Sequence, residues 1–187
     1  SIANYLDKKK LTLNAKIKKI NKISLNLFLS VGFLIIDKND DLILMQYINQ
    51  LCFKEIDYSD TTILYELLKK RNYSISHRQM PSYAAHVEFV KSSPYLNWYI
   101  FSHNENYLGT FYIKKDNSIG LDITNPCELL VKEVLNFILI NFVPQKEVKS
   151  QIPPYFYVNV ADDNKIMKNI LTKLKFEAIQ ISFKLNS

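Results

Sequence analysis

The sequence predicts an α/β (α+β) fold in which helices cover both faces of a mixed, mostly antiparallel sheet. Two observations predict this class. From residue 61 onward, hydrophobic periodicities follow the order helix, helix, three strands, helix, strand, helix and strand. A strand–helix–strand pattern also precedes this stretch, near the start of the chain. With 48% hydrophobic and 13% aromatic residues, a chain of 187 residues is able to bury a sizeable core.

The strand–helix–strand pattern occurs near both ends of the chain with the same spacing. Asn21 precedes Phe33 by as many residues as Asn164 precedes Phe176. Apolar positions between them recur at helical spacing, and asparagine is a favourable N-cap. The strand-like residues that flank the helices are Ala15 and Ile17, then 34–36 and 42–44, and, near the end, Val158 and Val160, then 178–185. We therefore predict a partial unit over residues 1–46, followed by a main domain over residues 47–187.

The residues between the two patterns predict two helices, three antiparallel strands and a third helix. Amphipathic periodicity favours the helices, and polar turns between short apolar runs favour the strands. The third helix is very apolar, with Asn125 as its predicted N-cap and Pro126 at its first position. The expected elements are helices over Thr61–Arg71, Pro81–Ser92 and Pro126–Phe142 and strands over Trp98–Ser102, Tyr107–Lys114, Ser118–Ile123 and Tyr155–Val160.

Composition excludes several classes of function. The chain has only 3 glycines, whereas average usage of about 7% would give roughly 13. The sequence contains neither a glycine-rich dinucleotide-binding fingerprint nor a P-loop. This excludes standard dinucleotide-binding enzymes and standard P-loop NTPases. The histidines lack metal-ligand spacing, so no metal site is predicted. We expect a cytoplasmic protein for three reasons. The two cysteines form no Cys-x-x-Cys motif, the sequence shows no signal peptide, and no apolar run is long enough to span a membrane.

The chain is basic, with a net charge of +6. Much of the excess lies in the lysines between Lys8 and Lys22. No nucleic-acid-binding motif accompanies them, so we interpret this run as a solvated face and expect neither a nucleic acid nor a membrane partner. A basic chain also suits anionic small molecules such as CoA or nucleotide-sugars.

Three blocks of the main domain carry a resemblance to a known family. They read Ile75-Ser76-His77-x-x-Met80-Pro81-Ser82-x-x-x-His86-x-x-Phe89-Val90, then Pro94-Tyr95-x-x-Trp98-Tyr99-Ile100, then Leu108-Gly109-x-x-Tyr112-Ile113. Over residues 58–187 the chain resembles the GNAT superfamily of acyl-CoA-dependent N-acyltransferases, and in particular a bacterial group associated with amino-sugar or nucleotide-sugar modification. Residues 12–45 resemble the closing strand–helix–strand of the same superfamily. This segment is then part of a longer fused protein, an eroded tandem repeat, or a chance extension of the same local pattern.

The resemblance implies direct transfer of an acetyl group from acetyl-CoA to the amine of a small molecule, such as an amino-sugar nucleotide. In the superfamily, the fourth strand and the loop after it hold the donor through backbone N–H groups. The loop at this position has no glycine and no basic residue, and Glu128 adds negative charge beside it. The donor-binding residues expected here are Leu121, Ile123, Thr124, Asn125, Asn159 and Asn164.

The resemblance also implies groups for proton transfer, although the usual residues are replaced. Ser118 stands where related sequences have a glutamate, so Asp122 is the predicted base, with Asp116 as the alternative. Leu171 stands where a tyrosine acid is usual, so Tyr157 is the predicted substitute. The remaining candidates are His77 and His86 for catalysis and Tyr95 and Trp98 for binding the acceptor.

Two functions remain open from the sequence. One is an active N-acetyltransferase. The other is a GNAT-fold module that has lost CoA binding and has a regulatory or assembly role, which the glycine-free loop and the replaced tyrosine favour. A homodimer or a fused partner domain is compatible with either function.

Overall fold

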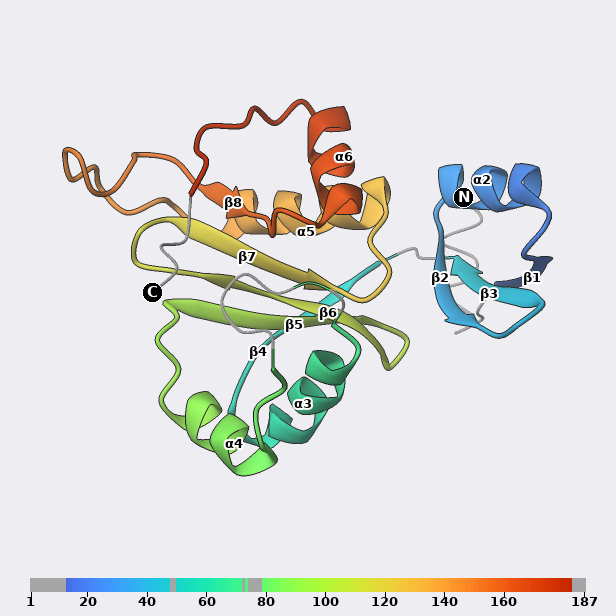
Figure 1. The fold of residues 1–187 in the computed structure, drawn as a ribbon, viewed down its shortest axis with the longest axis horizontal. Helices are drawn as coiled ribbons and strands as arrows, with labels where there is room; N and C mark the ends of the chain where they lie inside the picture. Colours follow the sequence, from blue (N-terminus) through green and yellow to red (C-terminus); the bar gives the residue numbers. More distant parts are fainter. Residues whose placement is uncertain (1–12, 48–49, 72, 74–78, 183–187) are drawn as a thin grey trace.

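The computed structural model describes residues 13–47, 50–71, 73 and 79–182. Within them the chain forms a sheet of three strands and a sheet of five (Figure 1). The first sheet belongs to the N-terminal unit, which consists of β1 (Asn14–Lys18), α2 (Lys22–Ser30), β2 (Phe33–Lys38) and β3 (Leu42–Tyr47). The main domain consists of β4 (Cys52–Glu55), a 3-10 turn (Tyr58–Asp60), α3 (Thr61–Lys69), α4 (Tyr83–Lys91), β5 (Asn97–His103), β6 (Asn106–Ile113), β7 (Ser118–Ile123), α5 (Glu128–Asn141), β8 (Tyr157–Asn159) and α6 (Lys165–Lys173).

The N-terminal unit is an antiparallel sheet in the order β1-β3-β2, with α2 packed on one face. The buried residues of the cluster beneath α2 are Ile17, Phe33, Ile43 and Met45. The side chain of Asn21 accepts a hydrogen bond from the Ser24 backbone at 3.0 Å, which satisfies one of the unpaired N–H groups at the start of α2. The strands, the helix and the N-cap predicted here are confirmed.

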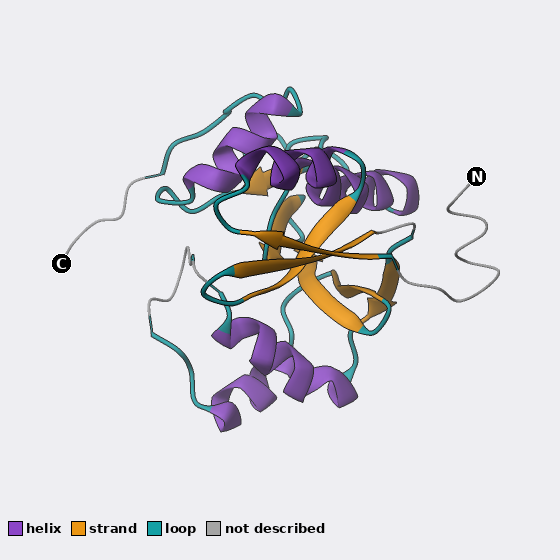
Figure 2. Ribbon diagram, turned by 90° about the vertical axis from the view of Figure 1, so that its right-hand side faces the viewer, coloured by secondary structure: helices purple, strands orange, loops and turns teal. Residues whose placement is uncertain are grey.

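The main domain confirms the predicted mixed, mostly antiparallel sheet. Its strands lie in the order β4-β5-β6-β7-β8, antiparallel from β4 to β7 and parallel between β7 and β8. The helices α3 and α4 cover one face, and α5 and α6 cover the other (Figures 1 and 2). Within the described residues, none of the helices combines the length and the hydropathy needed to cross a bilayer.

The main core lies between the sheet and α5. Successive strand residues point to opposite faces, so Phe101 on β5 and Phe111 on β6 both point toward α5, where they are fully buried. From α5, the side chains of Val131, Val134 and Ile138 fill the same core. The Asn117 side chain pins the segment after α5 to the start of β7, because its Nδ2 donates to the carbonyl oxygens of Gln145 and Pro153.

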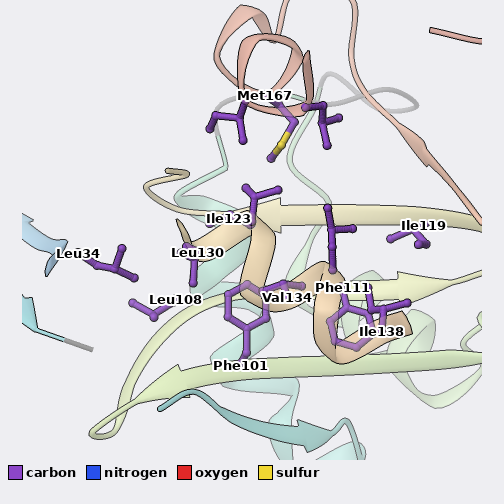
Figure 3. Close-up of a cluster of buried hydrophobic side chains, with 14 of the residues drawn as sticks. Leu34, Phe101, Leu108, Phe111, Ile119, Ile123, Leu130, Val134, Ile138 and Met167 are labelled. Carbon is purple, nitrogen blue, oxygen red and sulfur yellow. The ribbon is translucent and has the colours of Figure 1, made fainter. Parts of the chain in front are cut away.

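A buried contact joins the two units. Leu34 on β2 is only 2% exposed and packs with Leu108 and Leu130 of the main domain (Figure 3). The N-terminal unit therefore contacts the main domain through Leu34, a side chain of the three-stranded sheet.

The predicted start of the third helix is wrong. Asn125 was expected to cap it and Pro126 to open it, but α5 begins at Glu128 and Cys127 occupies the N-cap position with an extended backbone. The reason lies in the sheet, since Thr124 N donates to Leu108 O at 3.1 Å and so prolongs the β6–β7 pairing past the end of β7. The residues between β7 and Glu128 therefore stay outside the helix.

The predicted strand at residues 178–185 is absent where the structure describes it. Residues 178–182 form no strand, and 183–185 lie outside the described residues. In the N-terminal unit, the corresponding strand β2 pairs with β3 and not with β1. The described part of the main domain contains no strand equivalent to β3, so this segment has no neighbour with which to form a ladder. The short, mostly exposed β4 was not predicted, since its pattern lacks a clear alternation.

The two strand–helix patterns correspond in detail. The helices α2 and α6 each follow directly after an asparagine and each span 9 residues. Asn164 accepts a hydrogen bond from Met167 N at 3.0 Å, as Asn21 does from Ser24 N. At the equivalent positions after the helices, Gly32 and Lys175 both have positive φ angles, of 100° and 68°. This correspondence supports the hypothesis of a repeat, which stays a prediction together with the boundary at residue 46.

Candidate active site

A pocket of about 240 Å³ lies where β7 and β8 diverge. The parallel pairing of the two strands covers Ser118 to Gly120 on β7 and ends at Asn159 on β8. Beyond this point β7 continues without β8 beside it, and the space is open to ligands. A crevice beyond the carboxyl ends of parallel strands is a common binding place in α/β proteins. Its walls, which we call the strand-end pocket, are Leu29, Ile35 and Lys38 of the N-terminal unit, Arg71 and Tyr73 after α3, residues 121–127, and Asn164, Ile166 and Met167.

One end of a strand and the starts of two helices line the strand-end pocket. Lys114 N donates to Ser118 O, and Thr124 N to Leu108 O, so the even-numbered residues of β7 bond to β6. The N–H of Ile123 therefore points to the opposite side, from which β8 has diverged. Cys127 and Asn164, the N-cap residues of α5 and α6, also line the pocket. Two helix N-termini and one strand end thus favour an electron-rich or anionic ligand group here.

A single carboxylate, that of Asp122, lines the pocket among the described residues. Its Oδ2 lies 3.7 Å from the Nε of Arg71, which stands after α3. Burial raises the pKa of the Asp122 carboxyl, and the Arg71 guanidinium opposes this rise. A carboxylate with a raised pKa is better matched to accepting a proton near neutral pH than an exposed one.

Aromatic rings cover the sheet on the α4 side, next to Asp122. Tyr95 stacks on Tyr112 with 3.9 Å between ring centroids, and Trp98 meets Tyr95 edge-on at 5.3 Å. Burial raises the pKa of the Tyr95 hydroxyl well above its usual range, so this group stays protonated. Tyr95 and Trp98, the predicted acceptor-binding residues, are thus brought together in one cluster, although neither lines the strand-end pocket.

The structure brings most of the predicted donor-binding residues to the pocket. Leu121, Ile123, Thr124, Asn125 and Asn164 line it, whereas Asn159 is exposed at the end of the β7–β8 pairing and does not.

Tyr157 lies at the other end of β7, away from the pocket. It pairs with Ser118, the first residue of β7, and hydrogen-bonds with Ser118 and Asp116. Asp116 Oδ1 also accepts from Ser118 Oγ at 2.6 Å, and the hydrogen bonds from Ser118 outweigh burial and lower the pKa of the Asp116 carboxyl. The structure therefore groups these three residues with one another and not with Asp122.

The two predicted histidines do not join the pocket either. His86 is buried on α4, with its ring 5.2 Å from that of Tyr65 and a hydrogen bond to the Thr61 backbone. Burial lowers the pKa of its imidazole, so it is neutral at physiological pH. His77 lies outside the described residues.

Sequence reasoning missed Arg71, Tyr73 and the contribution of the N-terminal unit. Arg71 stood out only as a basic residue at the end of a predicted helix. Nothing in the local pattern of Leu29, Ile35 or Lys38 indicates that they meet residues far along the chain.

Comparison with known proteins defines the fold. No family model and no curated protein sequence matches the chain. Among solved structures, the chain is similar to the acetyltransferase AAC(6')-Iy in complex with a bisubstrate analogue, at 11% identity and a TM-score of 0.50, over 74% of this chain and 98% of that one. The chain therefore shares the fold of AAC(6')-Iy.

Two further structures show weaker similarity. The aminoglycoside N-acetyltransferase AAC(6')-Ib11 is 13% identical, with a TM-score of 0.46 over 66% of this chain and 84% of that one. A dodecameric spermidine N-acetyltransferase from Vibrio cholerae is 13% identical, with a TM-score of 0.47 over 71% of this chain and 82% of that one.

Proposed function

We propose that the chain transfers an acetyl group from acetyl-CoA to the amine of a small molecule, by direct attack of the amine on the thioester. The observation that carries the proposal is the end of β7, where Asp122 and the backbone of Ile123 line one pocket. The side chain of Asp122 points to the α3–α4 face of the sheet, while the Ile123 N–H points along the sheet toward the diverging β8. A thioester aminolysis needs a hydrogen-bond donor at the carbonyl oxygen and a base at the ammonium, and these two residues supply both.

The pocket fits one end of acetyl-CoA. A volume of about 240 Å³ is below the usual range for a drug-sized ligand, so the rest of the molecule would lie outside it. The N-termini of α5 and α6 suit its phosphates, and Leu121 and Met167 provide apolar contacts for its chain. When bound, the thioester supplies an activated acetyl group.

Asp122 takes a proton from the substrate ammonium and frees the amine to attack the carbonyl carbon. The Ile123 N–H stabilises the oxyanion that forms as the C–N bond is made. The C–S bond then breaks, and the extra proton on the newly bonded nitrogen passes to water, which leaves the neutral amide. The departing thiolate, with an ordinary thiol pKa of about 8.5, takes up a proton from water. Tyr157, the acid that the sequence predicts, has no place in this scheme while it stays with Asp116. Burial raises the pKa of the Cys127 thiol, which disfavours the thiolate form.

For the acceptor we propose an amino-sugar nucleotide. The faces of sugar rings pack well on aromatic side chains such as Tyr95 and Trp98, which lie on the side of the sheet that Asp122 faces. Arg71 offers a guanidinium for a phosphate group of the same acceptor. We expect a homodimer to be compatible with this site.

A catalytically inactive module is the second candidate. The observation that favours it is the segment 124–127, which lacks glycine, while Pro126 lacks a backbone donor. Calorimetric titration with acetyl-CoA separates the two functions. Micromolar binding supports the enzyme, and no binding at millimolar acetyl-CoA contradicts it.

The role of Asp122 is tested by release of the CoA thiol in the presence of a panel of amines. Asp122→Asn should lower kcat/KM by at least about 100-fold, since a positioned base contributes at least that factor. Glu133→Gln, an exposed change on α5 outside the pocket, is the matched control and should leave the rate unchanged. Loss of activity in Asp116→Asn but not in Asp122→Asn would assign the base to Asp116 instead.

A further inference from the structure

The strand-end pocket is shared between the two units of the chain. Leu29, Ile35 and Lys38 come from the N-terminal unit, and the remaining walls come from the main domain. The two units are held together by Leu34, which is buried against Leu108 and Leu130. Since Leu34 is the neighbour of Ile35, the contact that docks the units also holds β2 beside the pocket.

A bulge in β2 brings Lys38 to the pocket side of the strand. Residues 35 and 38 of a regular strand would point to opposite faces. Here the pairing with β3 shifts between Ile35 and Asp37, so that Ile35 lies opposite Met45 and Lys38 opposite Ile43. Met45 and Ile43 share a face, and therefore Ile35 and Lys38 share one too. Bulges often re-aim a side chain next to a functional site.

Lys38 also gives the pocket a positive charge that no carboxylate among the described residues of its walls pairs with. The charged residues lining it, within the described part of the chain, are Lys38, Arg71 and Asp122. Arg71 forms an ion pair with Asp122, whereas Lys38 has no ion pair among the described residues. The segment 124–127 has no basic residue, and Glu128 at the start of α5 is negative. Among the described residues that line the pocket, the cation without an ion pair is therefore on the N-terminal unit.

We propose that Lys38 is a donor-binding residue that contacts the diphosphate of acetyl-CoA, so that the N-terminal unit completes the donor site of the main domain. The inference rests on the proposed function. A lysine ammonium binds phosphate as a point charge, and it serves where the backbone cannot approach the phosphate closely. A diphosphate also occurs in a nucleotide-sugar acceptor, and the experiment distinguishes the two sources.

The test is calorimetric titration of the full chain with acetyl-CoA. Lys38→Ala should weaken binding about tenfold and Lys38→Glu more, as expected for the loss of a charge-assisted hydrogen bond. Lys38→Arg should retain most of the affinity, and the salt dependence of binding should be smaller in Lys38→Ala than in the parent chain. Lys18→Ala, an exposed lysine on β1 that does not line the pocket, is the matched control and should bind as the parent does.

The outcomes separate this inference from the proposed function. Binding of acetyl-CoA that Lys38→Glu leaves unchanged overturns the role of Lys38 but not the function. No binding to the parent chain at millimolar acetyl-CoA overturns the function and the inference with it. A parallel titration with UDP tests the other source of a diphosphate, the nucleotide-sugar acceptor. If Lys38→Ala binds UDP more weakly but binds acetyl-CoA as the parent chain does, the assignment of Lys38 to the donor is overturned as well. Circular dichroism of each variant establishes that the changes reflect binding and not unfolding.

Discussion

The ring of Tyr112 on β6 occupies the space in front of Gly120 on β7, where any other residue would place its Cβ. The two residues lie opposite each other in the β6–β7 register, and a Cβ at position 120 would overlap the ring atoms of Tyr112. Tyr112 is held in place by Tyr95, which stacks on it in a nearly parallel arrangement. This glycine is therefore required by packing next to the candidate site.

Gly120→Ala is expected to destabilise the protein by about 1–3 kcal/mol, because an added methyl group in a well-packed region forces neighbouring side chains to shift. Urea unfolding of the variant measures this loss. The double variant Gly120→Ala with Tyr112→Ala tests the cause, since removal of the ring should make the alanine nearly neutral. Equal losses from Gly120→Ala in both backgrounds would contradict this account.

The pH dependence of activity should follow the pair formed by Asp122 and Arg71. Burial raises the pKa of the Asp122 carboxyl, and the positive charge of Arg71 reduces this rise. Activity requires the ionised carboxylate, so it should rise with pH through this pKa. Arg71→Gln removes the lowering effect and should shift the rising limb of the kcat/KM profile to higher pH. A shift to lower pH, or none, would argue against Asp122 as the titrating base.

His86 should make stability depend on pH below neutrality. Burial lowers the pKa of His86 in the folded state below 6.5, so the folded protein keeps it neutral while the unfolded chain protonates it. Its contribution is complete above pH 6.5 and is lost as the pH falls toward the folded-state pKa. Urea unfolding should therefore show that the free energy of unfolding falls less between pH 8 and pH 5.5 in His86→Phe than in the parent. An identical loss would show that His86 is solvated.

Asn117 should be one of the residues least tolerant of substitution in the main domain. It is fully buried, has a φ of 66°, and bonds the backbone of Gln145 and Pro153 through its side chain. Asn117→Ala should cost about 2–4 kcal/mol, from lost hydrogen bonds and a left-handed backbone that disfavours alanine. Asn104→Ala is the control, because Asn104 shares the positive φ but is exposed, and should cost about 1 kcal/mol or less. A similar loss at both positions would assign the effect to the backbone alone.

Local sequence determined much of the secondary structure. Asn21 and Asn164 cap α2 and α6 as predicted, because a cap bonds to N–H groups only a few residues away. The strand predicted over Ser118–Ile123 agrees with β7 at both ends. One of the few glycines has a packing role, because the ring of Tyr112 leaves no room for a Cβ at Gly120.

Tertiary structure decided the composition of the site. Whether a tyrosine on a strand meets a carboxylate depends on which end of the neighbouring strand it pairs with, and pairing placed Tyr157 with Ser118 and not with Asp122. Burial between α3 and α4 made His86 neutral and removed it from the pocket. The start of α5 moved to Glu128 because a hydrogen bond from Thr124 to a different strand competed with local helix signals.

The sequence by itself determined most of the elements, their order and the α/β class, because these depend on side-chain periodicity and on bonds between near neighbours. Only the tertiary structure decided that Arg71 pairs with Asp122, and that Lys38 from the N-terminal unit reaches the end of β7. Such contacts join residues far apart in the chain, and they depend on strand pairing, bulges and the docking of Leu34, which no local pattern records.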